Sequence, residues 1–411
     1  MALRITISKC VNSRTPALLE SKRFSIIASV SYSKEVGGYR IIENTDLAAL
    51  KRGTGYRSSF NGTICTVFGC TGLIGRGLVN RLGRNGTQII AAYRGSAYDV
   101  TPLKVCADLG QMYFTPFHLR DEESIRTAVR HSNVVVNLIG QDCDSMNFKL
   151  EEVHIDGARR VARICREMGV KKLIHISAMG ASPNPKKILV PGGSRFLKSK
   201  YAGEQAVREE FPDAIIVRPA DVYGECDRFL YYYCRRERYF FRKLHLHEGG
   251  VNTIKAPISV NDFNEGLFEL VTRPKEQVNG KTYQFVGPQH YYLNELAGYI
   301  MGILLKLPES GYEILDSRLS LSFLAYLHIR NTFYLVKPAI GMHLERFERE
   351  NTSDILDKDL PTIADLGVKL HTLDLYIKDF TRAYRNISDY GDEVYELDFP
   401  SLPAPAQGVY A

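Results

Sequence analysis

The sequence predicts an α/β protein with a Rossmann-type, doubly wound parallel sheet, followed by a smaller α/β C-terminal unit and a helical tail. From residue 63, short apolar runs alternate with amphipathic stretches, and the first run ends in a glycine-rich turn. Buried strands that alternate with helices form βαβ units, in which helices cover both faces of a parallel sheet. The rhythm breaks after Pro219, where this first sheet is expected to end.

Six apolar runs are predicted to form the strands of this sheet. They lie at residues 63–69, 87–93, 112–117, 133–139, 172–177 and 214–217. Helices are predicted at 73–82, after the acidic residues 121–123, at 151–168 and at 198–211. The smaller unit is predicted to contain a strand near 253–259, a helix at 262–271, a strand at 282–285 and a helix from Leu293.

Pattern and composition divide the chain into six parts. We expect a mitochondrial transit peptide at 1–35, an extended segment at 36–62, the Rossmann domain at 63–225, the smaller α/β unit at 226–310, a helical interaction segment at 311–390 and an extended acidic and proline-rich tail at 391–411.

The basic charge is concentrated at the N-terminus. The net charge is +7, and residues 1–34 hold six Lys or Arg residues against one Glu, a local balance of +5. The rest is nearly neutral, which argues against nucleic-acid binding. The same segment is rich in Ser and poor in acidic residues, as mitochondrial transit peptides are; an ordinary disordered tail is the alternative.

Other features exclude further classes of function. No run of about 18 or more apolar residues occurs, so no transmembrane helix is expected. The eight cysteines form no Cys-x-x-Cys pair and no Cys/His cluster with zinc spacing, so we predict no metal site and interpret them as inert thiols. Residues 228–243 mix basic and aromatic side chains, as nucleic-acid sites do, but a packed helix and loop is the favoured interpretation.

Residues 315–336 combine Leu, Phe and Tyr with polar side chains. This segment is too polar to span a bilayer but apolar enough to be buried. Two interpretations stay open: the segment is core of the smaller unit, or it docks on a neighbouring protein or on a membrane surface.

The motif GCTGLIG at residues 69–75 follows the first predicted strand directly. Gly69 permits the tight turn, Gly72 lets the backbone approach a pyrophosphate, and Gly75 allows the helix to pack closely on the strand. The helix that follows then presents its first N–H groups to phosphates. Because the motif links a strand to a helix inside a βαβ unit, it predicts a dinucleotide site rather than a bare turn.

The second predicted strand ends at Tyr93, and Arg94 follows it. A site for NAD usually has Asp or Glu near this position, which accepts hydrogen bonds from the ribose hydroxyls. An arginine favours a 2′-phosphate instead, through charge-assisted hydrogen bonds, and Arg76 beside the last glycine can add charge. The sequence therefore predicts NADPH in preference to NADH; a solvated loop arginine is the alternative.

From about residue 63 to 286 the chain resembles the extended and atypical branch of the short-chain dehydrogenase/reductase superfamily. The resemblance rests on the glycine spacing and on two further segments. NLIG at 137–140 matches the family's segment over adenine and ribose, and RPADVYG at 218–224 matches its segment beside the nicotinamide. The chain departs from the pattern after the third strand, where His118 stands in place of the expected adenine-pocket Asp.

The resemblance also implies a catalytic Tyr-x-x-x-Lys helix, in which Lys binds the nicotinamide ribose and Tyr transfers a proton. Here Lys200 is present, but Phe196 occupies the tyrosine position. Tyr201 is one residue out of phase and points about 100° away on a helix. Ser177 matches the family's serine but lacks its phenol partner. We therefore expect cofactor binding without useful turnover.

Several segments, among them residues 67–90, 131–140 and 214–224, resemble more closely the family of NADPH-binding accessory subunits of respiratory complex I (NADH:ubiquinone oxidoreductase). That resemblance implies a tightly held NADPH that is not turned over, other complex I subunits as partners, and a peripheral place on the matrix side of the mitochondrial inner membrane near the arm junction. A free mitochondrial NADPH-dependent reductase or epimerase and an NADPH sensor remain the alternatives, and Phe196 opposes the first of them.

Motif and resemblance together imply no catalytic and no metal-binding residue. They imply these cofactor-binding residues: Gly69, Thr71, Gly72, Leu73, Ile74, Gly75, Arg94, Leu119, Leu138, Ile139, Gly140, Ser177, Lys200 and Pro219.

Overall fold

The computed structural model describes residues 32–36, 39–42, 51–52, 59–225, 227–333, 342–385 and 399–407. It contains two units, Met1–Leu50 and Lys51–Ala411. In the first unit, β1 (Tyr32–Val36) pairs with β2 (Tyr39–Ile42) in an antiparallel hairpin. Residues 1–31 of the predicted transit peptide, and most of the predicted tail, lie outside the described residues.

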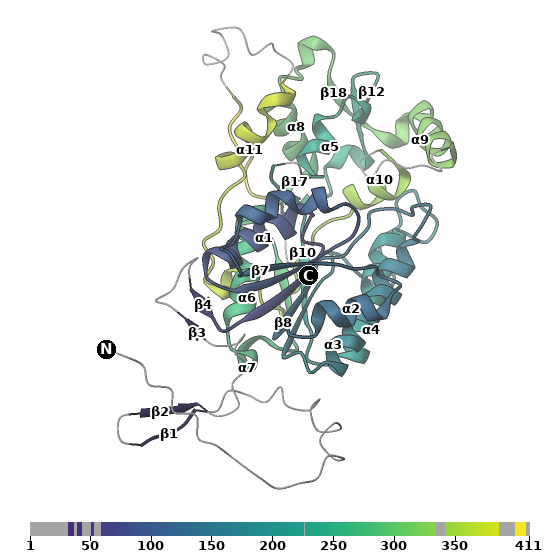
Figure 1. Cartoon of the computed structure of the whole chain (residues 1–411). Coiled ribbons are helices and arrows are strands. Elements are labelled where there is room, and N and C mark those ends of the chain that lie inside the picture. The colour runs from purple at the N-terminus through teal and green to yellow at the C-terminus, as the bar shows by residue number, and fades with distance from the viewer. Residues whose placement is uncertain are drawn as a thin grey trace. The chain divides into compact units, whose positions relative to one another are not determined.

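The second unit is built on a seven-stranded parallel sheet, which confirms the predicted fold class (Figure 1). Its strands in spatial order are β16 (Thr282–Phe285), β10 (Ile215–Pro219), β9 (Lys172–Ile176), β8 (Val134–Asn137), β5 (Ile64–Phe68), β6 (Gln88–Tyr93) and β7 (Met112–Pro116). All six strand pairs are parallel. The order reverses between β5 and β8, and such a switch point opens a ligand crevice at the carboxyl ends of the strands.

Helices cover both faces of this sheet. On one face, α1 (Leu73–Arg84) packs against α6 (Val260–Thr272). On the other lie α2 (Glu122–Val129), α3 (Ala158–Glu167), which a π-helical stretch at Glu152–Gly157 precedes, and α4 (Arg195–Glu210). Side chains of β8 alternate between the two cores, with Val134 and Val136 on the α1 side and Val135 on the α3 side. Burial on both faces explains why the strands are continuous apolar runs.

The structure corrects the assignment of residues 262–285 to the smaller unit. The strand at 282–285 is β16, which pairs in parallel with β10 as the seventh strand of the main sheet. The helix predicted at 262–271 is α6, which packs against α1. Hydrophobic periodicity identifies a buried strand but not the sheet that it joins, and a parallel partner can lie many residues away.

The strand predicted near 253–259 is instead two short strands, β14 (Ile254–Lys255) and β15 (Ile258–Ser259). Pro257 stands between them, and proline cannot donate to a strand ladder. β14 pairs with β17 (Tyr291–Tyr292), and β15 with β11 (Val222–Tyr223). The short helix α7 (Lys275–Val278) precedes β16. Ahead of β5, β3 (Lys51–Arg52) pairs antiparallel with β4 (Phe60–Asn61).

A second hydrophobic cluster gathers the remaining elements beyond the carboxyl end of the sheet (Figure 1). Its helices are α5 (Leu230–Cys234), α8 (Leu293–Ile303), α9 (Leu321–Phe333), α10 (Leu344–Glu350) and α11 (Asp374–Thr381), and its strands are β12 (Tyr239–Phe240), β13 (Lys243–Leu246) and β18 (Glu313–Asp316). The basic and aromatic residues 228–243 therefore supply the short helix α5 and most of the β12–β13 hairpin, where a helix and a loop were expected.

The apolar segment 315–336 has two faces. Phe323 and Leu327 of α9 are fully buried in the second cluster, whereas Leu321 is 80% exposed and Ile329 is 58% exposed. One face is therefore core, and the other stays open to solvent in this chain; residues 334–336 lie outside the described residues. None of the helices in the described ranges is both long and apolar enough to cross a membrane.

The chain returns to the sheet after α10. Gln284 of β16 donates its backbone N–H to the carbonyl of Pro361 over 2.9 Å, and Ile363 is buried in the core between the sheet and α6. The predicted helical segment 311–390 is thus interrupted by an extended strap that contacts the Rossmann core.

Candidate dinucleotide site

The glycine-rich turn lies between β5 and α1, and two of its glycines are required by the fold. Gly69 has a φ of +82°, in the left-handed region that favours glycine. A Cβ on Gly75 would lie 2.3 Å from the carbonyl oxygen of Gly69. Any side chain at either position would therefore disrupt the turn itself, whether or not a ligand is bound.

Gly72 is different because packing does not require it. Its φ is −75°, and a Cβ there would meet only the carbonyl oxygen of Gly69, at 3.4 Å. Gly72 is exposed and caps α1 without a side-chain hydrogen bond. Leu73, Ile74 and Gly75 form the first turn, whose N–H groups have no partner within the helix. These bare amides can hold phosphate groups.

A cavity of about 610 Å³ lies at the carboxyl ends of β6, β7 and β8. A volume of this size lies within the usual range for cofactor sites. It is lined by Arg94, His118, Arg120, Gly140, Gln141, Asp142, Cys143, Asp144, Ser145, Asn147, Phe148 and Arg228. The cavity thus begins where the sheet topology predicts the ligand crevice.

Arg94 lies in this cavity with its guanidinium 5.6 Å from the centre of the Phe148 ring. Within the described ranges, it makes no hydrogen bond or ion pair through its side chain. Arg120 lies over the same ring at 4.3 Å, and its Nη2 donates to the carbonyl of Asn147 over 2.6 Å. Sequence reasoning missed Arg120 and Phe148, because both stand in loops that no motif marks.

The end of β8 approaches the glycine turn closely. The N–H of Leu138 donates to the carbonyl of Phe68 over 3.0 Å, and a Cβ on Gly69 would lie 3.2 Å from the Leu138 backbone. Ile139 is half-buried and Gly140 is exposed in the cavity wall. Leu119, by contrast, is 4% exposed, its side chain packs against Gly157 and its carbonyl accepts a hydrogen bond from Nη1 of Arg160 over 2.6 Å, so its side chain is not open to a cofactor.

Phe196 and Lys200 lie on α4 beside the carboxyl end of β9. Lys200 is buried, and its Nζ donates to the carbonyl of Ile176 over 3.0 Å. Burial lowers the pKa of Lys200 to about 8, although Asp142 and Glu204 act in the opposite direction. Phe196 is buried, with its ring 5.9 Å from the Lys200 nitrogen.

Two other predicted residues stand close to the same strand ends. The Ser177 hydroxyl is buried and has no hydrogen-bond partner among the described residues. Pro219 is half-buried at the end of β10, and its carbonyl accepts the N–H of Met179 over 2.7 Å. Thr71 is half-buried in the turn, and its carbonyl accepts from Nε of Arg76 over 2.9 Å.

A buried histidine, which sequence reasoning did not single out, connects these parts. Nε2 of His154 accepts the N–H of Gln141 over 3.1 Å, so the proton is assigned to Nδ1, which lies 2.8 Å from the Ser199 hydroxyl. Ser199 in turn donates to the Phe196 carbonyl over 2.9 Å. Burial, with Lys200 nearby, holds the pKa of His154 well below its usual value, so the ring stays neutral. His154 fixes the loop after β8 against α4.

Comparison with known proteins decides the family. Residues 65–283 match the NAD dependent epimerase/dehydratase family. A mouse protein named NADH dehydrogenase (ubiquinone) 1 alpha subcomplex subunit 9, mitochondrial, is 37% identical over 85% of this chain and 88% of its own length. The chain belongs to this subunit 9 family. The NADH-ubiquinone oxidoreductase 40 kDa subunit, mitochondrial, of Neurospora crassa is 31% identical over 82% of this chain and 84% of its own length.

A solved structure shares the fold of this chain at low sequence identity. The dTDP-glucose 4,6-dehydratase DesIV from Streptomyces venezuelae, solved with NAD bound, superposes with a TM-score of 0.56 at 14% identity, covering 81% of this chain and 98% of its own. The epimerase/dehydratase fold is that of nicotinamide dinucleotide enzymes, and the relatives of this chain are mitochondrial complex I subunits.

The residues present fit a nicotinamide dinucleotide. Gly72 leaves space beside unsatisfied amides, the buried Ser177 hydroxyl lacks a partner among the described residues, and the guanidinium of Arg94 faces the cavity. Such a cofactor supplies hydride chemistry when it is bound. This chain has no phenol at position 196, where Phe196 stands.

Proposed function

We propose that this protein is a non-catalytic accessory subunit of mitochondrial complex I that binds NADPH as a structural cofactor. The bound nucleotide stabilises the fold and thereby supports assembly of the complex. The observation that carries the proposal is the pair Phe196 and Lys200, since the binding lysine is kept and the proton donor is absent. The complex I names of the relatives support the choice of assembly.

The missing phenol argues against the alternative of a free reductase or epimerase. A positioned acid or base contributes about 10² to 10⁴-fold to a rate. Phe196 has no ionisable proton, and its ring lies against His154, which is neutral and occupied by two hydrogen bonds. Tyr201 stands one residue after Lys200 on α4, on a different side of the helix from the Phe196 position, and does not replace Phe196.

The absence of turnover can be measured directly. Purified full-length protein with bound NADPH should reduce a panel of aldehydes, ketones and nucleoside-diphosphate sugars no faster than free NADPH in buffer reduces them. Stopped-flow absorbance of the reduced nicotinamide gives the rate. Turnover at about 1 to 10³ per second, the ordinary enzyme range, would overturn the proposal in favour of a reductase.

The choice of NADPH over NADH is supported by the cavity around Phe148. Arg94 lacks an ion-pair partner among the described residues, and Arg120 lies over the same ring. A 2′-phosphate would pair with such a guanidinium through charge-assisted hydrogen bonds. NADH has a neutral ribose hydroxyl in place of the 2′-phosphate, so it has no charge there that could pair with these arginines.

An Arg94→Asp variant should lose most of its preference for the phosphorylated cofactor. Losing a charge-assisted hydrogen bond costs about 1.5–3 kcal/mol, so the ratio of NADPH to NADH affinity should fall roughly tenfold to a hundredfold. Isothermal titration of both nucleotides measures the ratio. Arg130→Asp is the matched control, because Arg130 is exposed at the end of α2, just before the amino end of β8, whereas Arg94 follows the carboxyl end of β6. An unchanged ratio would show that Arg94 is only a loop residue.

We further propose that the protein lies peripherally on the matrix side of the inner membrane, near the junction of the matrix and membrane arms. The transit-like composition of residues 1–35 supports import. Exposed apolar side chains at Leu319, Leu321 and Ile329 form a surface for neighbouring subunits or for the membrane face.

A further inference from the structure

The short helix α10 lies against the start of α4, the helix that carries Phe196 and Lys200. It belongs by sequence to the C-terminal region, yet it contacts the start of α4 directly. The carboxylate of Glu345 accepts the backbone N–H of Phe196 over 2.9 Å and that of Arg195 over 3.3 Å. Ser194 also donates to Glu345. α10 therefore caps the helix that carries Phe196 and Lys200.

The same helix reaches the wall of the nucleotide cavity. The guanidinium of Arg349 lies 4.4 Å from the centre of the Phe196 ring, and its Nη1 is 2.9 Å from Oδ1 of Asp142. Asp142 lines the cavity and also pairs with Arg228, a second lining residue. Burial acts to raise the pKa of Asp142, but Arg349, Arg228 and Arg346 hold it below its usual range. The Asp142 carboxylate therefore stays charged.

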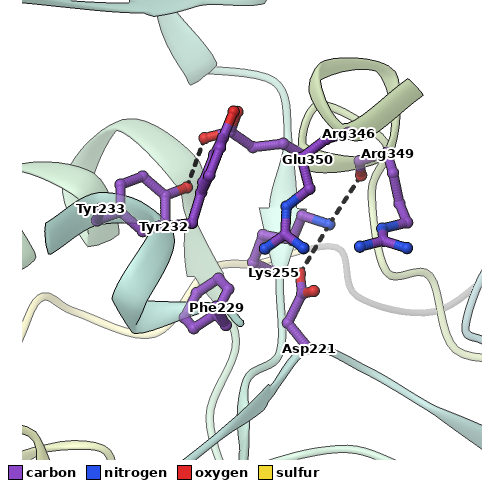
Figure 2. A pocket seen from close by; sticks show the side chains of 8 residues that line it. All are labelled: Asp221, Phe229, Tyr232, Tyr233, Lys255, Arg346, Arg349 and Glu350. Carbon is purple, nitrogen blue, oxygen red and sulfur yellow. Dashed lines mark hydrogen bonds and ion pairs between the residues drawn. The ribbon is translucent and has the colours of Figure 1, made fainter. Parts of the chain in front are cut away.

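The far side of α10 is anchored in the second hydrophobic cluster. Glu350 accepts the hydroxyl of Tyr233 over 2.7 Å and pairs with the buried Arg238 at 2.8 Å. Arg346 lies 4.7 Å from the ring of Tyr232. Figure 2 shows Arg346 and Arg349 reaching from α10 towards Asp221, with the aromatic residues of α5 opposite.

Lys255 connects the end of α10 to the sheet. Its Nζ donates to the carbonyl of Arg349 over 3.3 Å and lies 3.3 Å from the carboxylate of Asp221, just beyond the end of β10 (Figure 2). Asp354 is its second carboxylate neighbour, at 3.6 Å. One seven-residue helix thus joins three places: the start of α4, the cavity wall and the second cluster.

We propose that α10 is a latch that closes the nicotinamide end of the site, so that nucleotide leaves only when Arg349 and Glu345 release their partners. The inference rests on the proposed function. It goes further in naming a segment of the chain itself, α10, as the element that closes this end of the site. Because coupling between two sites is reciprocal, bound nucleotide would also hold α10 and the second cluster in place. Nucleotide occupancy would thereby be transmitted to the face that carries α9.

The test is the rate of nucleotide release from the full chain loaded with radiolabelled NADPH and chased with unlabelled NADPH. Arg349→Met and Glu345→Gln each remove one attachment of the latch while keeping the approximate shape of the side chain. Each variant should release label at least about tenfold faster than the unaltered chain. Arg159→Met is the matched control, because Arg159 pairs with Glu209 on the outer side of α3 and α4. The control should release label at the unaltered rate.

Hydrogen exchange on the unaltered chain gives a second readout that needs no variant. The amides of α10 should exchange more slowly with NADPH bound than without it. Release at the unaltered rate in both latch variants, or equal α10 exchange with and without NADPH, would overturn the latch while leaving the proposed function intact. A chain that binds no NADPH at all would overturn both proposals.

Discussion

A Gly72→Val variant should fold normally and bind almost no dinucleotide. The backbone at Gly72 has a φ of −75°, which valine adopts readily, and its Cβ would meet only one protein atom within 4 Å, at ordinary contact distance. The branched side chain would instead occupy the space beside the first amides of α1. Losing two charge-assisted hydrogen bonds to phosphate, at about 1.5–3 kcal/mol each, lowers affinity roughly a hundredfold to ten-thousandfold.

Thermal unfolding with and without NADPH measures this effect and checks the fold together. A ligand that binds only the folded state stabilises it by about 4 kcal/mol at a thousandfold excess over Kd. The unaltered chain should therefore melt at a higher temperature with NADPH, and the variant should not respond. Gly298→Val on α8 is the matched control, because a Cβ there has no neighbour within 4 Å. A Gly72→Val chain that still responds to NADPH would disprove the placement of the phosphates.

A Glu350→Gln variant should lose about 3–5 kcal/mol of stability, the usual cost of breaking a buried ion pair from one side. The side chain of Arg238 is fully buried, and its guanidinium is bonded to Glu350 and to the carbonyl of His245. Removing the carboxylate charge leaves this cation buried without compensation. A protein of this kind is stable by only about 5–15 kcal/mol, so the second cluster would be close to unfolding.

Urea denaturation measures the loss, and two comparisons identify its cause. Glu313→Gln removes the solvent-exposed ion pair between Glu313 on β18 and Lys243 on β13, and it should cost about 1 kcal/mol or less of stability. The double variant Arg238→Met, Glu350→Leu should recover most of the stability, because no unpaired charge remains in the core. A loss in Glu350→Gln no larger than in Glu313→Gln would contradict the role of the buried pair.

The sequence predicted the fold where a local pattern determines it. The first six strands of the main sheet along the chain, the glycine turn and the helices beside them all follow from periodicity and from one motif. The strand at β16 was predicted but was assigned to the smaller unit, because a strand that 62 residues separate from β10 carries no local mark of its partner. The contact of residues 351–371 with the sheet edge was not predicted, for the same reason.

The residues of the candidate site that a local motif marks were also predicted, and those that distant segments contribute were not. Gly69, Gly75 and Lys200 lie where motif and resemblance placed them, in the turn and beside the strand ends. Arg120 and Phe148 are brought to Arg94 by loops, and Arg349 comes from a helix 153 positions after Phe196. Such long-range neighbours depend on tertiary packing, which residue spacing does not reveal.

The most direct test of the central claim is blue-native electrophoresis of mitochondria whose only copy of this chain carries Gly72→Val. The account predicts that fully assembled complex I falls well below the level in a Gly298→Val control, while the flavin and iron–sulfur chemistry of the remaining complex is normal. That result would follow because an empty site weakens the fold without removing any catalytic group. Full assembly of the complex around a Gly72→Val chain shown to lack nucleotide would contradict the claim that NADPH is a structural cofactor.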